Sequence, residues 1–160
     1  MRCAAHGEVG ALNGKAPWRA SNLMIRLLAV GERDALAAVL ARENLPRDGL
    51  DDASGLFWRL DSMQDVPLGY GGIELHGDDA LLRSVVTLPP ARQRGIGSAI
   101  VTVLETEAAI AVCHTIYVLA GAGGLFERLG YGVCGPGRVP RFIAGRGPGA
   151  AVVMIKRLAP

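Results

Sequence analysis

ALLRSVVTLPPARQRGIGSAIVTVLETEAAIA, residues 80–111, carries the strongest structural signal in the chain. Its beginning, Ala80–Leu88, is mostly apolar and predicts a buried strand, which two consecutive prolines then end. A polar loop follows, and Gly95-Ile96-Gly97 precede an apolar periodic run that predicts a helix to about Ala111. The segment is therefore predicted to be a strand, a tight loop and a helix that begins on glycine.

The start of this helix has the properties of an anion-binding site. The first backbone N–H groups of a helix have no intrahelical partner and lie at the positive end of the helix dipole, which favours phosphate oxygens. Glycine lets a phosphate approach the backbone because it has no side chain. Arg92 and Arg94 flank these donors and add positive charge. We interpret the segment as a pyrophosphate-binding loop.

Several explanations compete for a glycine loop of this kind. A nucleoside-triphosphate loop requires a lysine that this segment lacks. A dinucleotide-binding fingerprint requires a third glycine where the chain has Ile100, and an acidic residue at the ribose-binding distance, which is missing. An acyl-CoA site remains, whereas in a purely structural explanation the glycines only cap a helix beside a strand.

The spacing Arg92-Gln93-Arg94-Gly95-Ile96-Gly97 is similar to the R/Q-x-x-G-x-G/A signature of the GNAT N-acetyltransferase family, in which the signature follows a strand and opens a helix. The resemblance extends from about Met24 to Leu158. Within the family, the chain most resembles the small subgroup associated with arsenic-resistance operons. The stretches that suggest this subgroup are Leu45-Pro46, Gly72-Ile73-Glu74, Leu81-Leu82-Arg83-Ser84 and Phe126-Glu127-Arg128-Leu129-Gly130-Tyr131.

The resemblance implies an α/β (α+β) fold, with a single mixed, mostly antiparallel sheet flanked by helices, and acetyl-CoA as co-substrate. The pantetheine arm would lie between two splayed strands, here Ala80–Leu88 and Thr115–Leu119. Backbone groups of Val85, Val86 and Thr87 would hold the arm, and the Val86 N–H would polarise the thioester carbonyl. The residues that would hold the pyrophosphate are Arg92, Gln93, Arg94, Gly95, Ile96, Gly97 and Ser98.

Length and composition narrow the class of protein. A chain of 160 residues, half hydrophobic and one-fifth charged, fits one globular domain. The formal net charge of +2 gives no reason to expect a nucleic-acid or membrane partner, and no apolar run approaches the ~20 residues of a membrane span. Three cysteines without C-x-x-C pairing suit the reducing cytoplasm and lack metal-ligand spacing, so we expect no metal. A monomer and a homodimer both remain open.

The other elements follow from local patterns. Residues 1–23 lack periodicity and predict a flexible extension, so we expect the domain to span residues 24–160. A helix over residues 32–42 would bury Leu36, Val39 and Leu40, whereas Leu56–Leu60 fits a strand or a helix equally. The remaining predictions are strands at Met24–Val30, Tyr131–Cys134 and Ala151–Arg157, a short helix at Gly123–Leu129 and one helical turn at Val139–Ala144.

Val66–Leu75 and Ala80–Leu88 predict a hairpin around Gly77-Asp78. Glycine in the first place of a two-residue loop suits a type II′ turn, which pairs His76 with Asp79 and Glu74 with Leu81. Strand alternation then places Glu74 on the same face as Arg83. A slip of one residue would place it beside Ser84 instead.

Direct acyl transfer to an amine needs a base for the ammonium and an acid for the departing CoA thiolate. Glu74 is the candidate base, directly or through a water; a solvated strand residue or a salt bridge to Arg83 is the alternative. Many family members use a tyrosine in Y-E-K-x-G-F as the acid, but this chain has Phe126 at that position. Candidates for the missing acid are Ser84, Tyr131, Tyr117 and solvent.

Two residues are candidates for contacting the acceptor. A guanidinium in a buried strand usually binds a planar anion, so Arg83 would suit an amino-acid-like acceptor, although an edge position or a pair with Glu74 also explains it. Trp58 lies where the family forms its acceptor pocket, with core packing as the alternative.

These observations predict an N-acetyltransferase that moves the acetyl group of acetyl-CoA to a primary amine of a small molecule, in a ternary complex without an acyl-enzyme. The resemblance adds an organoarsenical to the possible acceptors. One alternative is a non-catalytic acyl-CoA-binding or sensing module, which Phe126 favours. Another is a protein N-acetyltransferase, which would require an open acidic groove.

Overall fold

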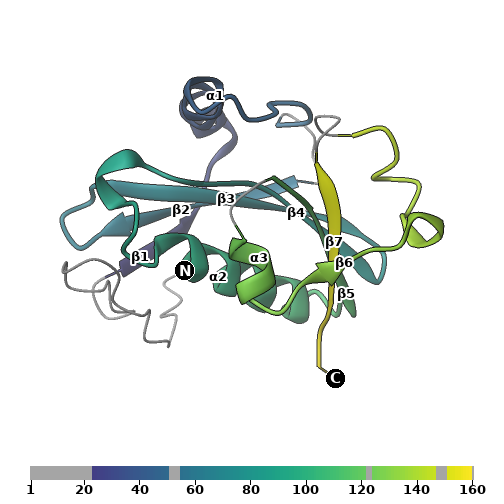
Figure 1. Cartoon of the computed structure of the whole chain (residues 1–160). Helices are drawn as coiled ribbons and strands as arrows, with labels where there is room; N and C mark the ends of the chain where they lie inside the picture. Colours follow the sequence, from purple (N-terminus) through teal and green to yellow (C-terminus); the bar gives the residue numbers. More distant parts are fainter. Residues whose placement is uncertain (1–22, 51–54, 122–123, 147–150, 160) are drawn as a thin grey trace.

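A single seven-stranded sheet runs through the described part of the molecule (Figure 1). This computed structural model describes residues 23–50, 55–121, 124–146 and 151–159. Helix α1 (Arg33–Arg42) covers one face of the sheet, and α2 (Ile96–Ile110) and the short α3 (Leu125–Arg128) cover the other. The strands are β1 (Leu23–Leu27), β2 (Gly55–Ser62), β3 (Pro67–His76), β4 (Asp79–Thr87), β5 (Thr115–Ala120), β6 (Gly132–Val133) and β7 (Val152–Arg157).

The sheet is mixed and mostly antiparallel, which confirms the predicted fold class. Its order is β1-β2-β3-β4-β5-β7-β6, and β4 with β5 is the one parallel pair among the described strands. Leu56–Leu60, which fitted a strand or a helix, belongs to β2 because it pairs with β1 on one side and β3 on the other. The extension predicted for residues 1–23 lies outside the described residues apart from Leu23, which begins β1.

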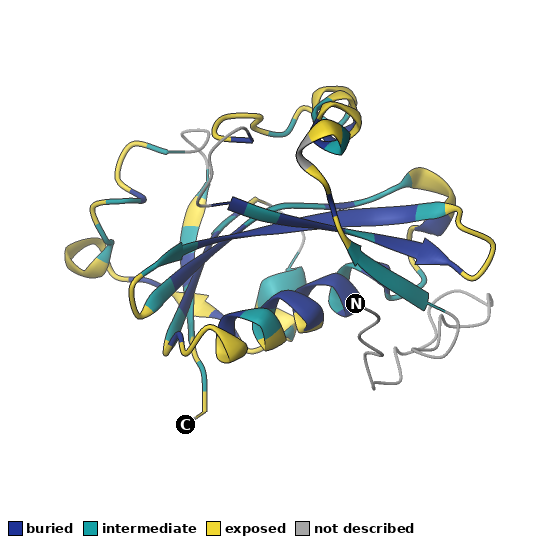
Figure 2. Ribbon diagram, turned by 180° about the vertical axis from the view of Figure 1, so that it is seen from behind, coloured by how far each residue is buried: buried dark blue, intermediate teal, exposed yellow. Residues whose placement is uncertain are grey.

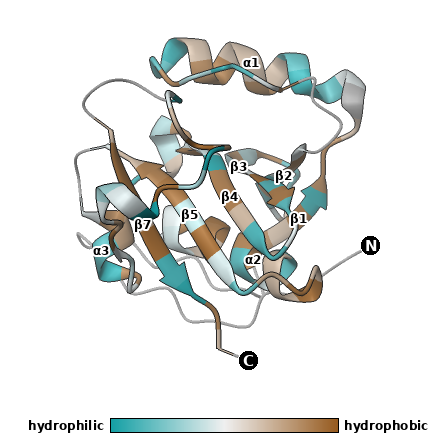
Figure 3. Cartoon of the chain, turned by 90° about the vertical axis from the view of Figure 1, so that its right-hand side faces the viewer, coloured by the Kyte–Doolittle hydropathy of each residue, from teal (hydrophilic) through white to brown (hydrophobic). Residues whose placement is uncertain are grey.

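Each face of the sheet has its own apolar core, and buried residues concentrate on the central strands and the inner sides of the helices (Figure 2). Leu36, Val39 and Leu40 of α1 are buried as predicted. Colouring by hydropathy shows apolar residues along the central strands of the sheet (Figure 3). Helix α2 lies close to β3 because β3 carries glycine there: a Cβ on Gly71 would lie 2.5 Å from Ile100 Cγ2.

The β3–β4 hairpin has the predicted register. His76 pairs with Asp79 and Glu74 with Leu81, around a turn in which Gly77 has a φ of +64°. A positive φ at the first turn position is the conformation that glycine adopts without strain. Glu74 and Arg83 therefore share one face of the sheet, as the local turn chemistry predicts.

Strand β4 departs from regular alternation at Ser84. Gly72 pairs with Arg83 and Tyr70 with Val86, so that two residues of β4 lie opposite the single residue between Tyr70 and Gly72. This is a β-bulge, and Ser84 takes a φ of +55° within it. The bulge reverses the faces of the residues that follow, and Val86 consequently packs into the core beneath α1.

The segment between β6 and β7 contains a 3₁₀ turn at Pro136–Arg138 and then hydrogen-bonded turns where one helical turn was predicted at Val139–Ala144. The Pro140 carbonyl accepts from the Ile143 N–H at 3.0 Å and from the Ala144 N–H at 3.3 Å, and the second of these bonds has the four-residue spacing of a helical turn. A further turn follows, in which the Arg146 N–H donates to the Ile143 carbonyl at 3.0 Å. Across the described ranges, no helix has the length and apolar character to cross a membrane.

Candidate active site

The predicted pyrophosphate loop precedes α2. Gly95 is the N-cap of α2 with a φ of +80°, a conformation that favours glycine. The first helical bond runs from the Ala99 N–H to the Gly95 carbonyl at 3.1 Å. The N–H groups of Ile96, Gly97 and Ser98 lie before that bond, so they have no carbonyl four residues earlier within the helix. Such a helix start suits an anionic ligand.

Gly97 lies close to the end of β4 and to the start of α3. A Cβ at Gly97 would lie 3.3 Å from Leu125 Cδ2 and 3.6 Å from Thr87 Oγ1. Arg92, predicted to bind phosphate, forms an ion pair with Glu43 at 2.5 Å and donates from Nε to the Thr87 carbonyl at 3.2 Å. The arginine therefore lies beside the loop and also contacts the residue that follows α1.

A pocket of about 260 Å³ lies where β4 and β5 separate. The two strands pair only from Asp79–Thr115 to Leu82–Val118 and then diverge. The loop after α1 and the helix α3 lie on opposite faces of the sheet (Figure 1), and both line the pocket, which therefore passes between the strands. The lining residues are Asn44, Leu45, Pro46, Asp48, Leu81, Leu82, Arg83, Ser84, Val85, Val118, Leu119, Gly121, Phe126, Arg146 and Ala151.

The backbone of β4 presents different N–H groups to this gap from those predicted. The Leu88 N–H donates to the Leu68 carbonyl of β3 at 2.9 Å. Successive N–H groups of a strand point to opposite edges, so the Val86 N–H also points to β3, where Val86 pairs with Tyr70. The Val86 N–H therefore does not point into the gap between β4 and β5. The N–H groups of Val85 and Thr87 point to the side of β5.

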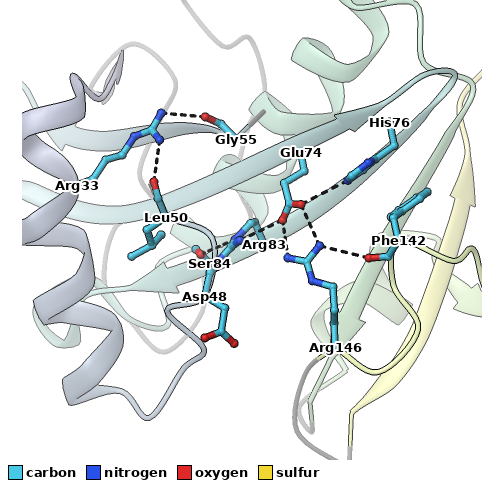
Figure 4. Close-up of polar contacts among 10 residues, drawn as sticks. All are labelled: Arg33, Asp48, Leu50, Gly55, Glu74, His76, Arg83, Ser84, Phe142 and Arg146. Carbon is cyan, nitrogen blue, oxygen red and sulfur yellow. Dashed lines mark hydrogen bonds and ion pairs between the residues drawn. The ribbon is translucent and has the colours of Figure 1, made fainter. Parts of the chain in front are cut away.

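The predicted catalytic carboxylate lies in a cluster of cations (Figure 4). Glu74 is 4% exposed. Arg146 donates to both of its oxygens, from Nη1 to Oε1 at 2.9 Å and from Nη2 to Oε2 at 2.7 Å, and Arg83 Nη1 donates to Oε2 at 3.0 Å. His76 Nε2 lies 3.4 Å from Oε1. The salt bridge to Arg83, one of the two roles considered for Glu74, is present.

These contacts make Glu74 a weak base. Burial on its own would raise the pKa of the carboxyl group, but the hydrogen bonds and charges of Arg146 and Arg83 outweigh burial and lower the pKa to about 2. Glu74 also lies outside the pocket lining, behind Arg83 and Arg146. The geometry favours the ion-pair role, and the base role stays a prediction.

Arg83 joins three parts of the site. Its Nε donates to Ser84 Oγ at 3.3 Å, its Nη1 to Glu74 and its Nη2 to the Asp48 carbonyl in the loop after α1. Its guanidinium carbon lies 5.6 Å from the centre of the Phe57 ring, a distance typical of a cation–π contact. Arg83 thus holds the loop that forms one wall of the pocket.

The candidates for the general acid occupy different environments. Ser84 lines the pocket. Tyr131 lies outside the lining; its buried hydroxyl donates to Glu105 Oε1 at 3.0 Å, and burial together with the Glu105 charge raises the pKa of Tyr131 far above its usual range. Tyr117 is also buried outside the lining. Phe126 presents an apolar ring to the pocket in place of a hydroxyl. Position therefore favours Ser84 among these side chains.

Trp58 does not contact the pocket. It packs in the core beneath α2, next to Leu60 and Leu104, on the opposite face of the sheet from Arg83. Strand alternation explains this position, because the neighbouring Phe57 is the β2 residue that packs beneath α1 on the face of Arg83. Trp58 thus packs in the core, which was the alternative to an acceptor contact, and does not line the pocket between β4 and β5.

Two charged residues of the pocket lining, Arg146 and Asp48, were not predicted from the sequence. Arg146 lies in a turn of the loop between β6 and β7, far along the chain from Glu74. Asp48 is the only carboxylate among the described lining residues, and its carboxylate points away from Glu74 (Figure 4). Both residues lie in irregular segments whose position depends on long-range contacts, so no periodic pattern could have identified them.

Comparison with known proteins agrees with this architecture. A model of the acetyltransferase (GNAT) family matches residues 23–131. The chain therefore belongs to the GNAT acetyltransferase family, and it is an acyl-CoA-dependent N-acyltransferase. No curated protein matches it.

Among solved structures, the fold is similar to N-acetylglutamate synthase from Neisseria gonorrhoeae complexed with coenzyme A and L-arginine, with a TM-score of 0.73, 17% identity, and coverage of 87% of this chain and 34% of that one. A GNAT-family acetyltransferase from Staphylococcus aureus gives a TM-score of 0.68, 14% identity and coverage of 86% and 99%. PaiA N-acetyltransferase from Thermoplasma acidophilum, in complex with coenzyme A, gives a TM-score of 0.63 and 12% identity, with coverage of 85% of this chain and 99% of that one. These similarities concern the fold.

Proposed function

We propose that the protein transfers the acetyl group of acetyl-CoA to a primary amine of a small molecule. The observation that carries this proposal is the pocket between β4 and β5, which joins the side of the helix-start loop to the side of Arg83. A thioester entering from one face and an amine entering from the other would meet between the strands. Bringing two reactants together in this way supplies much of the rate of a direct transfer.

The donor half of the proposal rests on backbone groups. The loop Arg92–Ser98 would hold the pyrophosphate, and the N–H groups of Val85 and Thr87 would contact the pantetheine arm and the thioester carbonyl. Negative charge develops on that carbonyl oxygen during attack, so a fixed N–H donor would stabilise the transition state. Two structures with the same fold contain coenzyme A, which supports acetyl-CoA as the co-substrate.

The chemistry is a single substitution at the thioester carbon. The neutral amine forms the new C–N bond, the C–S bond breaks, the nitrogen loses a proton and the CoA thiolate gains one. Ser84 is the side chain of the pocket that could donate to the thiolate, and solvent is the alternative. The role of Glu74 as the base stays a prediction, and its ion pairs with Arg83 and Arg146 oppose that role.

The acceptor side supports a small molecule. The pocket is small, and two arginines contribute to its lining, whereas a protein acceptor with a basic end would need an open acidic groove. An amino-acid-like amine or an organoarsenical with an amino group fits this size. Cys113 and Cys134 are free thiols, which suits the cytoplasm as the compartment.

Calorimetric titration of the purified protein with acetyl-CoA tests the proposal, with NAD and ATP as control ligands. We expect selective binding of acetyl-CoA. A thiol-release screen over amines, amino acids and organoarsenicals would then identify the acceptor. Failure of folded protein to bind acetyl-CoA, or release of thiol without any acetylated amine, would contradict the proposal.

A further inference from the structure

Two guanidinium groups from distant parts of the chain meet at the acceptor side of the pocket. Arg83 comes from β4 and Arg146 from the loop before β7, and both donate to Oε2 of Glu74, at 3.0 and 2.7 Å. Among the described residues, both guanidinium groups therefore face the same carboxylate beside the pocket (Figure 4). An anion that enters the pocket would be attracted to this pair of cations.

Arg83 also has hydrogen-bonding capacity left. A guanidinium carries five N–H donors, and the contacts of Arg83 with Ser84, Glu74 and Asp48 use one on each of its three nitrogens. One N–H on each terminal nitrogen is therefore without a partner in the described part of the chain. Its side chain is 10% exposed and lines the pocket, so these donors lie where an acceptor would bind.

Arg146 is held at the pocket by a well-packed turn. Ile143 of the same turn is 1% exposed in the core with Leu81, and the ring of Phe142 stacks on His76 at 4.0 Å between centroids and 8° between planes. His76 in turn lies next to Glu74. The two-oxygen contact with Glu74 then fixes the guanidinium of Arg146 in one orientation.

We infer that the acceptor carries an oxyanion group, such as a carboxylate or a phosphonate, and that Arg83 and Arg146 bind this group together. This inference rests on the proposed function and adds the chemical class of the acceptor. Asp48, the carboxylate of the described lining, supplies the opposite charge elsewhere in the pocket. A small zwitterion with an amine and an oxyanion matches this distribution of charge.

Glu74 then acts as a positioning residue. Both of its oxygens bind guanidinium groups, so it orients the two cations toward the pocket and reduces the repulsion between them. A base would have to accept the ammonium proton on one of these occupied oxygens. A positioning role and a base role make different predictions for acceptors that lack the anion.

A binding experiment tests the inference without requiring turnover. Thermal stabilisation of the CoA-bound protein is measured against L-amino acids and aminoalkyl phosphonates, each paired with its uncharged amide or ester. We expect at least one oxyanion amine to bind and its uncharged partner to bind about ten- to hundredfold more weakly, since charge-assisted hydrogen bonds are lost. Binding by no oxyanion amine, or equal binding of the uncharged partners, overturns the inference.

Arg146→Gln and Arg141→Gln are the matched variants for this experiment. Both remove one positive charge from the same turn, but Arg141 is exposed and outside the pocket lining. We expect Arg146→Gln to weaken binding of the oxyanion amine about ten- to hundredfold and Arg141→Gln to leave it unchanged. Unchanged binding in folded Arg146→Gln overturns the inference.

Steady-state kinetics with amines that the protein acetylates distinguish a positioning role of Glu74 from a role as the base. We expect Glu74→Gln to raise KM for the oxyanion amine and to spare its uncharged partner. Equal loss of kcat for both amines would instead identify Glu74 as the base and overturn the positioning role. Failure of the proposed function is distinct: it would appear as binding of the oxyanion amine without acetylation by acetyl-CoA.

Discussion

The donor and acceptor halves of the site are built in different ways. The proposed donor half consists of backbone groups from one continuous segment, the end of β4 and the start of α2. The proposed acceptor half consists of side chains from β3, β4, the loop after α1 and the loop before β7. Backbone donors depend on local conformation, whereas a side-chain cluster depends on how distant segments pack.

This difference implies a difference in tolerance to substitution. Most side chains of the donor loop can change as long as glycine keeps the helix start open. In the proposed acceptor half, Glu74 binds both Arg83 and Arg146, so substitution of Glu74 removes a counter-charge from two partly buried cations. Substitutions in the two halves should therefore differ in effect.

Gly97→Glu should abolish binding of acetyl-CoA. The substitution places bulk and negative charge at the proposed phosphate site, and a like charge costs several kcal/mol, so we expect Kd to rise more than about 100-fold. Calorimetry measures the affinity. The control is Gly97→Ala, whose Cβ meets only the flexible end of Leu125 and the Thr87 hydroxyl, at 3.3 and 3.6 Å. Retained affinity in folded Gly97→Glu would refute the placement of the loop.

Glu74→Gln should lower the free energy of unfolding by about 3 kcal/mol at neutral pH, because it leaves Arg83 and Arg146 partly buried without their counter-charge. Urea denaturation gives this value. Glu127→Gln, on the exposed side of α3, is the control and should stay within about 0.5 kcal/mol of the original protein.

The same pair of proteins should show a defined pH dependence. The pKa of Glu74 falls from 4.5 to about 2 in the fold, so its stabilising contribution is present above about pH 4.5 and is lost as pH falls toward 2. The stability difference between the original protein and Glu74→Gln should therefore shrink on acidification. A constant difference down to pH 3 would contradict the ion-pair assignment.

Ser84→Ala should lower kcat by up to about 100-fold if the hydroxyl protonates the CoA thiolate, with little change in acetyl-CoA affinity. Steady-state kinetics with the acceptor found in the screen measures this effect. Thr106→Ala removes an exposed hydroxyl from α2 and should change neither parameter. A kcat within threefold of the original would assign the protonation to solvent.

Glu43→Gln should produce the smallest effect. The Glu43–Arg92 ion pair is partly exposed, and such pairs contribute about 0.2–1 kcal/mol. Removal of Glu43 frees Arg92 for the pyrophosphate, so calorimetry should show up to about fivefold tighter acetyl-CoA binding. Asp34→Asn in α1 removes an equal charge and serves as the control. Weaker binding in Glu43→Gln would show that the pair organises the loop instead.

Features governed by neighbouring residues could be predicted from the sequence. The glycine-opened helix after β4 and the Gly77 turn follow from local conformational preferences, and that turn sets the register that places Glu74 beside Arg83. The family signature in the loop lies within the same short segment. These features are specified by residues that are close in the chain, so the pattern of residue types was enough.

Other features required the assembled sheet. Because of the bulge at Ser84, the N–H groups of Val85 and Thr87, and not that of Val86, point to the side of β5. No residue type in the sequence predicts such a bulge. Trp58 and Phe57 differ by one position, and only pairing on both sides of β2 assigned them to opposite faces.

Arg146 reaches Glu74 across 72 positions of the chain because β7 returns beside β5 and brings the preceding loop to the pocket. The residue types alone were enough to predict the proposed donor site, since backbone conformation follows local sequence. Long-range packing was needed to form the cluster of Glu74, Arg83 and Arg146, because charges so distant in the chain become neighbours only when the sheet is complete.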